Sequence, residues 1–309
     1  MLVMRPAATW QLHSRTLSLG ARTLIMAVVN ITPDSFSDGG SFLDPQVAIT
    51  YALQCLDDGA DILDLGAEST RPGSNSANHA PTVSADEEQS RLLPVLEGVL
   101  RVRPDAIISV DTYKAATARA ALAAGAEIIN DVSGFTWDPD SNPDMPHICA
   151  EDHAGVVLMH TRGRPEEWRT QPQLAPDALL SLVFEGLSTS LAAAEQAGVL
   201  PQSVVLDPGY GFGKRVGENY LLLARQHELL ALGRPLLTGV SRKSFLGHTL
   251  APLHAGQPAA VNQRETASIA AMVAAILNGA SIVRVHTVRP AVEAALIADD
   301  LLRSTRDHR

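Results

Sequence analysis

Short apolar stretches alternate with longer amphipathic ones along nearly the whole chain. Most of the short stretches are rich in Val, Ile and Leu without a clean alternation of apolar and polar positions, which is typical of strands buried on both faces of a parallel sheet. On this pattern we predict eight strands, at residues 23–30, 61–65, 106–111, 127–131, 155–160, 203–207, 235–239 and 281–286.

Helices are predicted between these strands, where Ala and Leu recur with charged residues on one side. Several of them end in Gly followed by Ala directly before a strand, as at Gly59, Gly125 and Gly279, and glycine is the residue that most readily ends a helix. The eight predicted helices are 46–57, 85–101, 113–123, 144–153, 177–197, 217–231, 264–277 and 288–302.

Eight strand–helix units in about 260 residues predict a single (β/α)8 TIM barrel of the α/β class. A doubly wound open sheet is the alternative, but a long loop, residues 31–44, follows the first strand in place of the glycine fingerprint of that fold. Residues 1–20 form an N-terminal extension, in which we expect residues 8–19 to make a short hairpin that plugs the bottom of the barrel. We find no domain boundary and treat 1–309 as one domain.

Composition narrows the class of protein. The chain has 309 residues, of which 46% are hydrophobic and 19% charged, as in a soluble globular protein with a large core. Its net charge of −10 argues against a surface that grips nucleic acid or an anionic membrane. No apolar run approaches the length of a membrane span, and the first residues show no secretory signal. Cys55 and Cys149 are expected to be buried free thiols, which fits a reducing compartment, and we predict a cytoplasmic protein.

The residues that end the predicted strands are informative, because active sites of such barrels lie at the C-terminal ends of the strands. A single Asp there is more often a helix cap, and we expect Asp131 to be structural. Convergence from all eight strands is different, since so many buried polar groups need a ligand or water to satisfy them. The groups are Asn30, the segment 68–73, Asp111, Asn130 with Asp131, His160, Asp207, the segment 241–244, and Arg284 with His286.

This rim combines two kinds of chemistry. Asp111, Asn130 and Asp207 suit a flat heterocycle with several N–H groups, since one carboxylate can accept a ring N–H and an adjacent amino group together. The cations of the rim suit an oxyanion. They are Arg71, Lys243 and Arg284, with His286.

In their order and spacing, these segments resemble the dihydropteroate synthase family over nearly the whole chain. The most specific motifs are NITPDSFSDGG at residues 30–40 and DLGAESTRPG at 64–73. Shorter motifs follow: SVDT at 109–112, INDVSG at 129–134, MH at 159–160, DPGYGFGK at 207–214, SRKS at 241–244 and RVH at 284–286. The resemblance implies an enzyme of folate biosynthesis that condenses 6-hydroxymethyl-7,8-dihydropterin pyrophosphate with 4-aminobenzoate.

The resemblance also implies roles for individual residues. The implied pterin pocket consists of Asp111, Asn130, Met159, Asp207 and Lys243. The implied contacts to pyrophosphate are Asn30, Arg71, Arg284 and His286. The implied contacts to 4-aminobenzoate, with which sulfonamide drugs compete, are Thr70, Pro72, Phe212, Lys243 and Ser244. Asn30 and Asp38 are implied ligands of Mg²⁺ on the pyrophosphate, and the family's usual dimer implies a homodimer.

The implied reaction is a transfer of the pterinylmethyl group with SN1 character. Mg²⁺ and arginine neutralise charge on the departing pyrophosphate, and carboxylates stabilise a pterin cation that the neutral arylamine attacks. Closure of two loops, 31–44 and 71–83, would exclude water from that cation. The catalytic candidates are Asp38, Asp111, Asp207 and Lys243.

Three residues depart from the usual family pattern, and none of them is a ligand named above. Thr287 stands where Asp usually follows the RVH motif, Thr161 replaces Met after the MH motif, and Tyr210 replaces an aliphatic residue between two glycines. Lys214 invites comparison with a phosphate-binding loop, but its spacing from the preceding glycines differs, and we reject a P-loop.

Two other functions stay open at the level of sequence. A methyltransferase that passes a methyl group from methyltetrahydrofolate to a corrinoid protein shares the Asp and Asn contacts to pterin, but it does not need the 32–40 loop or the SRKS segment. A pterin-binding paralogue with little activity is the second alternative. The complete set of pterin, anion and loop residues argues against it.

Overall fold

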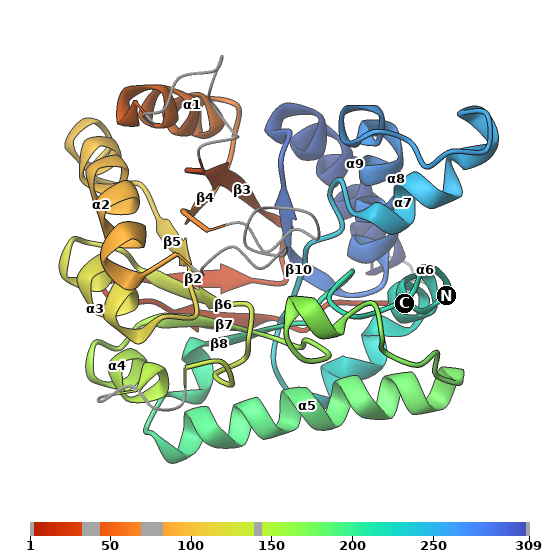
Figure 1. The fold of residues 1–309 in the computed structure, drawn as a ribbon, viewed down its shortest axis with the longest axis horizontal. Coiled ribbons are helices and arrows are strands. Elements are labelled where there is room, and N and C mark those ends of the chain that lie inside the picture. The colour runs from red at the N-terminus through yellow and green to blue at the C-terminus, as the bar shows by residue number, and fades with distance from the viewer. Residues whose placement is uncertain (1–2, 33–43, 69–82, 139–143, 307–309) are drawn as a thin grey trace.

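The computed structural model describes residues 3–32, 44–68, 83–138 and 144–306. Within these ranges, eight parallel strands form a closed barrel in the order β10–β3–β4–β5–β6–β7–β8–β9, and helices surround it (Figure 1). The predicted (β/α)8 fold is confirmed, and each strand lies within two residues of its predicted bounds. The strands are β3 Leu24–Asn30, β4 Ile62–Gly66, β5 Ile108–Asp111, β6 Ile128–Asp131, β7 Gly155–Met159, β8 Val204–Asp207, β9 Leu236–Thr238 and β10 Ala280–Val285.

The helices follow the strands as predicted, with small shifts at most ends. Polar side chains begin several of them: the Asp44 carboxylate accepts from the Gln46 N–H at 2.9 Å, and Ser84 accepts from the Glu87 N–H at 3.2 Å. The helices of the barrel are α1 Pro45–Asp57, α2 Ala85–Val102, α3 Ala115–Ala123, α4 Met145–Glu151, α5 Pro176–Gln196, α6 Val216–Arg225, α8 Glu265–Leu277 and α9 Val288–Arg306.

Two segments differ from the prediction. The predicted helix 217–231 is α-helical only to Arg225 and continues as a 3-10 helix, η4 Gln226–Leu232. At the junction, the buried amide of Gln226 donates to the Ala275 carbonyl at 2.8 Å and so ties this part of the chain to α8. Helix α7, Ser244–Thr249, was not predicted, because its six residues are too few to show an apolar period.

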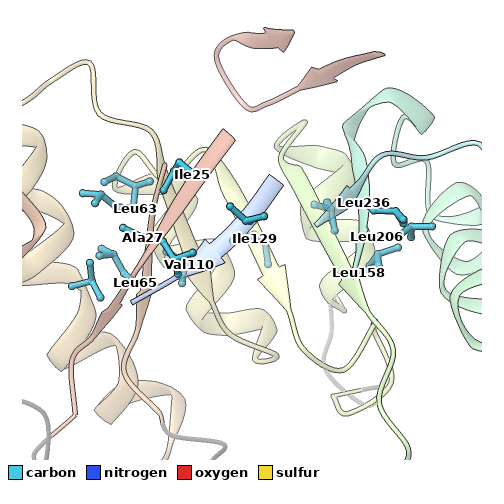
Figure 2. Packing of buried hydrophobic residues seen from close by; sticks show 14 of the residues in the cluster. Ile25, Ala27, Leu63, Leu65, Val110, Ile129, Leu158, Leu206 and Leu236 are labelled. Carbon is cyan, nitrogen blue, oxygen red and sulfur yellow. The ribbon is translucent and has the colours of Figure 1, made fainter. Parts of the chain in front are cut away.

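Alternation along the strands separates two sets of side chains, because successive residues of a strand point to opposite faces. One set faces outward and packs against the helices in a continuous apolar core; it includes Ile25, Leu63, Val110 and Leu206 (Figure 2). The other set faces the barrel interior. Several residues of the second set that end strands are polar, including Asn30, Asp111 and Asp207, so the parity that builds the core also directs polar groups to one end.

A hairpin closes the other end of the barrel. Strands β1 Ala8–Gln11 and β2 Thr16–Leu19 pair antiparallel, which confirms the predicted N-terminal hairpin. Trp10 is fully buried and joins an interior cluster with Met26 and Val205, and its Nε1–H donates to the Ser203 carbonyl at 2.8 Å. The hairpin therefore plugs the N-terminal end of the barrel with apolar side chains.

Helix α5 is, among the described helices, the one whose length and composition would allow it to cross a membrane, with a mean hydropathy of 1.3 over its most apolar window. The sequence pattern did not lead us to expect such a helix. One side of it, including Leu179, Val183 and Leu187, is buried against the barrel. Figure 1 shows α5 lying along the barrel beside its neighbours, so packing accounts for its apolar face.

Replacing Trp10 with alanine should lower the free energy of unfolding by about 3–5 kcal/mol, because the plug loses its largest side chain and leaves a cavity. Denaturant titration measures this loss. The control is Leu253→Ala, at a position that is 79% exposed, which should change the same quantity by less than about 0.5 kcal/mol. Similar values for the two variants would show that the hairpin is not part of the core.

Candidate active site

A cavity of about 390 Å³ opens at the C-terminal ends of the strands. It is lined from β3, β5, β6, β7, β8 and β10 and from the segments that follow β8 and β9. Ten of the residues predicted for the site line this one cavity: Asn30, Asp111, Asn130, Met159, Asp207, Phe212, Lys243, Ser244, Arg284 and His286. The other predicted residues, Asp38, Thr70, Arg71 and Pro72, lie outside the described residues.

Asp64 holds the floor of the cavity together. It is fully buried in β4 and accepts three hydrogen bonds, from Ser109 Oγ at 2.6 Å, Asn130 Nδ2 at 3.1 Å and Arg284 Nε at 2.6 Å. Arg284 Nη2 in turn donates to Asp111 Oδ2 at 2.7 Å. A buried carboxylate is tolerated when it is paired in this way, and here the pairing fixes two residues that face the cavity.

Asp64 was missed as a site residue by reasoning on strand ends, because it lies in the middle of β4. A signal was present, since an acidic residue between Leu63 and Leu65 in a strand buried on both faces needs a buried partner. Glu68 was placed on the predicted rim within the segment 68–73 but was given no role of its own. It lines the cavity and pairs with Lys114, whose ammonium also lies 3.4 Å from Glu88.

Two of the carboxyl groups that line the cavity, those of Asp111 and Asp207, are hard to ionise. Burial raises the pKa of Asp111 to about 7; Arg284 opposes this shift and the nearby Asp64 adds to it. Burial also raises the pKa of Asp207, against its hydrogen bond from the Gly209 N–H at 2.7 Å and the charge of Lys243. Desolvated carboxyl groups of this kind gain more than exposed ones from a ligand that brings N–H donors.

Cationic and imidazole groups gather on the β9 and β10 side of the cavity. His286 Nδ1 lies 3.0 Å from Ser241 Oγ, and the Tyr51 hydroxyl donates to the His286 carbonyl at 2.8 Å. Arg242 adopts a positive φ of 58°, and its backbone N–H donates to Ser268 Oγ at 2.9 Å. These contacts fix the backbone that carries the cations at the rim.

An aromatic wall stands opposite Lys243. Phe212 meets Trp168 edge to face with ring centroids 5.1 Å apart, and Lys243 Nζ lies 4.1 Å from the Phe212 ring centroid. The Trp168 Nε1–H donates to the Gly163 carbonyl at 3.0 Å. A flat apolar face beside a cation suits a ligand that has both an aromatic ring and a negative charge.

The three departures from the family pattern are each accommodated by a hydrogen bond. Arg242 Nη2 donates to Thr287 Oγ1 at 3.0 Å, and Thr161 Oγ1 donates to the Gly163 carbonyl at 2.9 Å. Tyr210 is buried, and its hydroxyl donates to Gln226 Oε1 at 2.7 Å. Thr161 and Thr287 lie outside the described lining of the cavity, and Tyr210, which is part of that lining, has its hydroxyl bound to Gln226.

Two residues of the predicted rim do not line the cavity. Asp131 accepts from the Ser133 N–H at 2.7 Å and the Phe135 N–H at 2.9 Å, as expected of a structural residue. His160 is buried against α5, where a Cβ added at Gly186 would lie 2.6 Å from its ring, and burial lowers its pKa well below the ordinary value. Its expected place on the rim was wrong, because it follows the last residue of β7 and takes the opposite parity from Met159.

Comparisons with known proteins agree with this geometry. The family model described as "Pterin binding enzyme" matches residues 26–286. Dihydropteroate synthase of Synechocystis is 40% identical, covering 92% of this chain and 92% of that protein, and that of Bacillus subtilis is 38% identical, covering 97% and 96%.

Solved structures of dihydropteroate synthases are similar as well. The Clostridium difficile structure, which contains pteroic acid, has a TM-score of 0.80 and 38% identity and covers 92% of this chain and 98% of that chain. The Yersinia pestis structure, in complex with a sulfonamide drug, has a TM-score of 0.82 and 36% identity and covers 97% and 100%.

Replacing Asp64 with alanine should lower the free energy of unfolding by about 3–5 kcal/mol, because Arg284 loses a buried ionic partner. Chemical denaturation checks this value. The matched control is Arg289→Ala on α9, whose pair with Glu293 at 3.0 Å is exposed on both sides and should contribute less than about 1 kcal/mol. If both variants lost the same small amount, Asp64 would not be the support of Arg284.

Proposed function

The chain belongs to the pterin-binding enzymes and, within them, to the dihydropteroate synthases, and we propose that its cavity carries out their reaction. The pterinylmethyl group of 6-hydroxymethyl-7,8-dihydropterin pyrophosphate is transferred to the amine of 4-aminobenzoate, giving 7,8-dihydropteroate and pyrophosphate. The observation that carries the proposal is the convergence of carboxylates, amide and cations from successive strands in one cavity. The corrinoid methyltransferase alternative is set aside, because relatives similar over nearly the full chain are synthases.

The pterin ring is proposed to bind in the deep part of the cavity. Asp111 and Asp207 would accept the ring N–H and amino groups, and the Asn130 amide would take a further position on the ring edge. Lys243 would donate to a ring acceptor, and Met159 would pack on the ring face. Asn130 is supported for this role by its hydrogen bond to Asp64, which orients its amide.

The pyrophosphate is proposed to lie against β3 and β10, which pair in parallel and carry Asn30 and Arg284, with His286 directly after β10. Arg284 spends two of its donors on Asp64 and Asp111, and a guanidinium has about five in all, so others are available to an oxyanion. Arg71, outside the described residues, completes the proposed set.

The described residues fit a Mg²⁺ ion that is held mainly by the substrate. Asn30, whose side chain carries an amide oxygen, lines the cavity, and the described ranges contain no cluster of three His, Cys, Asp or Glu that could hold a metal by itself. Mg²⁺ commonly keeps waters and binds through few protein groups plus phosphate oxygens. We propose that Asn30 and Asp38 hold it, and that it would offset negative charge on the pyrophosphate.

The arylamine is proposed to bind nearer the mouth of the cavity, against the Phe212 ring with Lys243 and Ser244 beside its carboxylate. Thr70 and Pro72 would complete this part of the site. The interaction between Lys243 and the Phe212 ring supports the placement, because it holds a cation at the edge of an apolar surface. A sulfonamide would compete there, since it also presents an aromatic amine.

The reaction then needs little proton transfer from the protein. Departure of pyrophosphate leaves positive charge on the pterinylmethyl group, which ionised Asp207 and Asp111 stabilise through space. The arylamine attacks as the neutral amine, and the acidic proton of the resulting anilinium can pass to the released pyrophosphate or to water, so no strong general base is assigned. The protein's main contributions are orientation of the two substrates and exclusion of water.

We further propose that the protein acts in the cytoplasm as a homodimer. The resemblance to the family supports the dimer, and two free buried cysteines suit a reducing compartment. The remaining alternative is that the protein is a pterin-binding paralogue with little activity. An assay of turnover distinguishes this alternative from an active synthase.

The test of the function is release of pyrophosphate from purified protein mixed with the pterin pyrophosphate, Mg²⁺ and 4-aminobenzoate. We expect release that depends on the arylamine, together with formation of 7,8-dihydropteroate detected by mass. Release of pyrophosphate that does not depend on the arylamine would indicate hydrolysis of the pterin pyrophosphate. An absence of release would favour the paralogue with little activity.

Two variants should separate the two halves of the site. Asp207→Ala should weaken pterin binding by about 2–5 kcal/mol, because the buried N–H donors of the pterin and the nearby protein cations lose the carboxylate with which they pair. Ser244→Ala should mainly raise KM for 4-aminobenzoate, by a free energy of about 1.5–3 kcal/mol, as expected for a hydrogen bond to a charged group. Calorimetry and steady-state kinetics measure these effects, and wild-type behaviour of both variants would contradict the assignment.

Pterin affinity should increase with pH between about 6 and 8. The pKa of Asp111 is raised to about 7, so the ionised form that accepts N–H groups is lost as the pH falls through this value. With this pKa, about one tenth of the molecules are ionised at pH 6 and about nine tenths at pH 8, which predicts roughly tenfold tighter binding of 7,8-dihydropteroate at pH 8. Asp111→Asn should flatten the profile and Ser244→Ala should retain it; a flat wild-type profile would refute the role.

A further inference from the structure

Lys214 is a buried cation whose partners are all backbone carbonyls. Its side chain is largely enclosed, and its Nζ donates to the carbonyls of Gly209 at 2.7 Å, His160 at 3.2 Å and Phe212 at 3.4 Å. An ammonium has three donors, so these contacts use all of them. From the sequence we considered a phosphate-binding role for Lys214 and rejected it. In the structure its ammonium binds backbone carbonyl groups.

The segment between Asp207 and Lys214 bends around this ammonium. Gly209, Gly211 and Gly213 have φ values of 71°, 85° and 72°, a left-handed region that glycine adopts without steric cost. A Cβ at Gly209 would lie 1.8 Å from the His160 carbonyl oxygen. The alternating glycines therefore let several carbonyls turn toward one point, which the Lys214 ammonium occupies.

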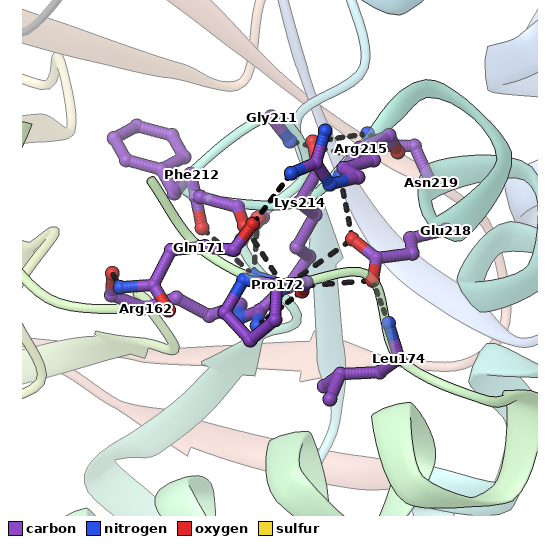
Figure 3. Close-up of polar contacts among 12 residues, drawn as sticks. Arg162, Gln171, Pro172, Leu174, Gly211, Phe212, Lys214, Arg215, Glu218 and Asn219 are labelled. Atoms are coloured by element: carbon purple, nitrogen blue, oxygen red, sulfur yellow. Dashed lines mark hydrogen bonds and ion pairs between the residues drawn. The ribbon is translucent and has the colours of Figure 1, made fainter. Parts of the chain in front are cut away.

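Polar side chains from α6 and from the loop that follows β7 support the segment from outside (Figure 3). Asn219 Oδ1 accepts from the Gly211 N–H at 2.7 Å, and Arg162 Nη1 donates to the Gly213 carbonyl at 3.2 Å. Glu218 lies 3.4 Å from Arg162 and accepts from the Arg215 N–H at 2.6 Å. The Lys214 ammonium is the part of this network that reaches both Gly209 and Phe212.

The other side of the same segment forms a wall of the cavity. The Phe212 ring faces Lys243 at 4.1 Å, and the Gly209 N–H donates to Asp207 Oδ1 at 2.7 Å. Lys214 thus binds the carbonyls of the two residues whose other groups contact the proposed arylamine and pterin sites. Its positive charge also opposes the rise in the pKa of Asp207 that burial causes.

We propose that Lys214 is a positioning residue, which holds the segment 208–214 so that Phe212 and Asp207 are oriented for the two substrates. This inference rests on the proposed function of the cavity. The alternative is that Lys214 only stabilises the fold. Burying an ammonium for that purpose alone is unfavourable, since burial lowers the pKa of Lys214 to about 7 in spite of the nearby Asp207. The presence of a lysine here is explained by its effect on the segment 208–214, which it holds in the conformation that forms one wall of the cavity.

The test compares Lys214→Met with a matched control, Arg5→Met. Arg5 is also buried and donates to Thr23, Asp299 and the Ala280 carbonyl, but its barrel end is the one remote from the cavity. Both variants should lower Tm. Only Lys214→Met should raise KM for 4-aminobenzoate and lower kcat/KM, by on the order of 10- to 100-fold, as expected when a reactive geometry is misplaced by about 1 Å.

A second readout does not depend on turnover. Hydrogen exchange of the Gly209 and Gly211 amides should accelerate in Lys214→Met and stay at the wild-type rate in Arg5→Met, because only the first variant releases the segment. Should Lys214→Met fail to fold, Gly209→Ala displaces the same segment with the lysine present and should show the same kinetic change.

The outcomes separate this inference from the proposed function. Inactive wild-type protein would overturn the function, while amide exchange and titration with 4-aminobenzoate would still report on Lys214. Active wild-type protein with a Lys214→Met variant that loses Tm alone, as Arg5→Met does, would overturn the positioning role. Faster exchange at Gly209 together with weaker binding of 4-aminobenzoate would establish it.

Discussion

The ion pair between Arg284 and Asp64 is the interaction on which the rest of the site depends. It joins β10 to β4 across the interior of the barrel, and the further contacts of its two members reach Asn130 and Asp111. Neither charge would be stable in this place alone, because burial of an unpaired ion is costly. The floor of the cavity is therefore one electrostatic unit, in which the hydrogen bonds between the groups hold them in place.

The parity of the strands explains how a large apolar core and a strongly polar cavity coexist a few residues apart. In β8, Leu206 points outward to the helices while Asp207 lines the cavity, and in β6 Ile129 and Asn130 divide in the same way. A shift of one residue in any strand would exchange these directions and bury a polar group among helices. Packing of the apolar side chains against the helices thus also fixes the direction in which the polar side chains point.

Much of this arrangement could be predicted from sequence, and the failures have physical causes. Strand ends such as Asp207 and Arg284 were found because chain order alone brings them to one rim. Asp64 was missed because its importance comes from partners far away in sequence, and α7 because a helix of six residues has no readable period. His160 was wrongly placed on the rim, because it directly follows Met159 and its side chain points to the opposite face. The contacts of Lys214 depend on glycine conformations that sequence does not show.

The N-terminal hairpin bears on the order of events in the cavity. Because Trp10 and its neighbours close the base of the barrel, the entrance that the described residues leave to the cavity lies at the opposite end. A molecule bound near that entrance blocks passage to the floor. With the two substrates placed as proposed, the pterin would therefore bind before the arylamine, and the joined product would leave along the path by which its deeper half entered.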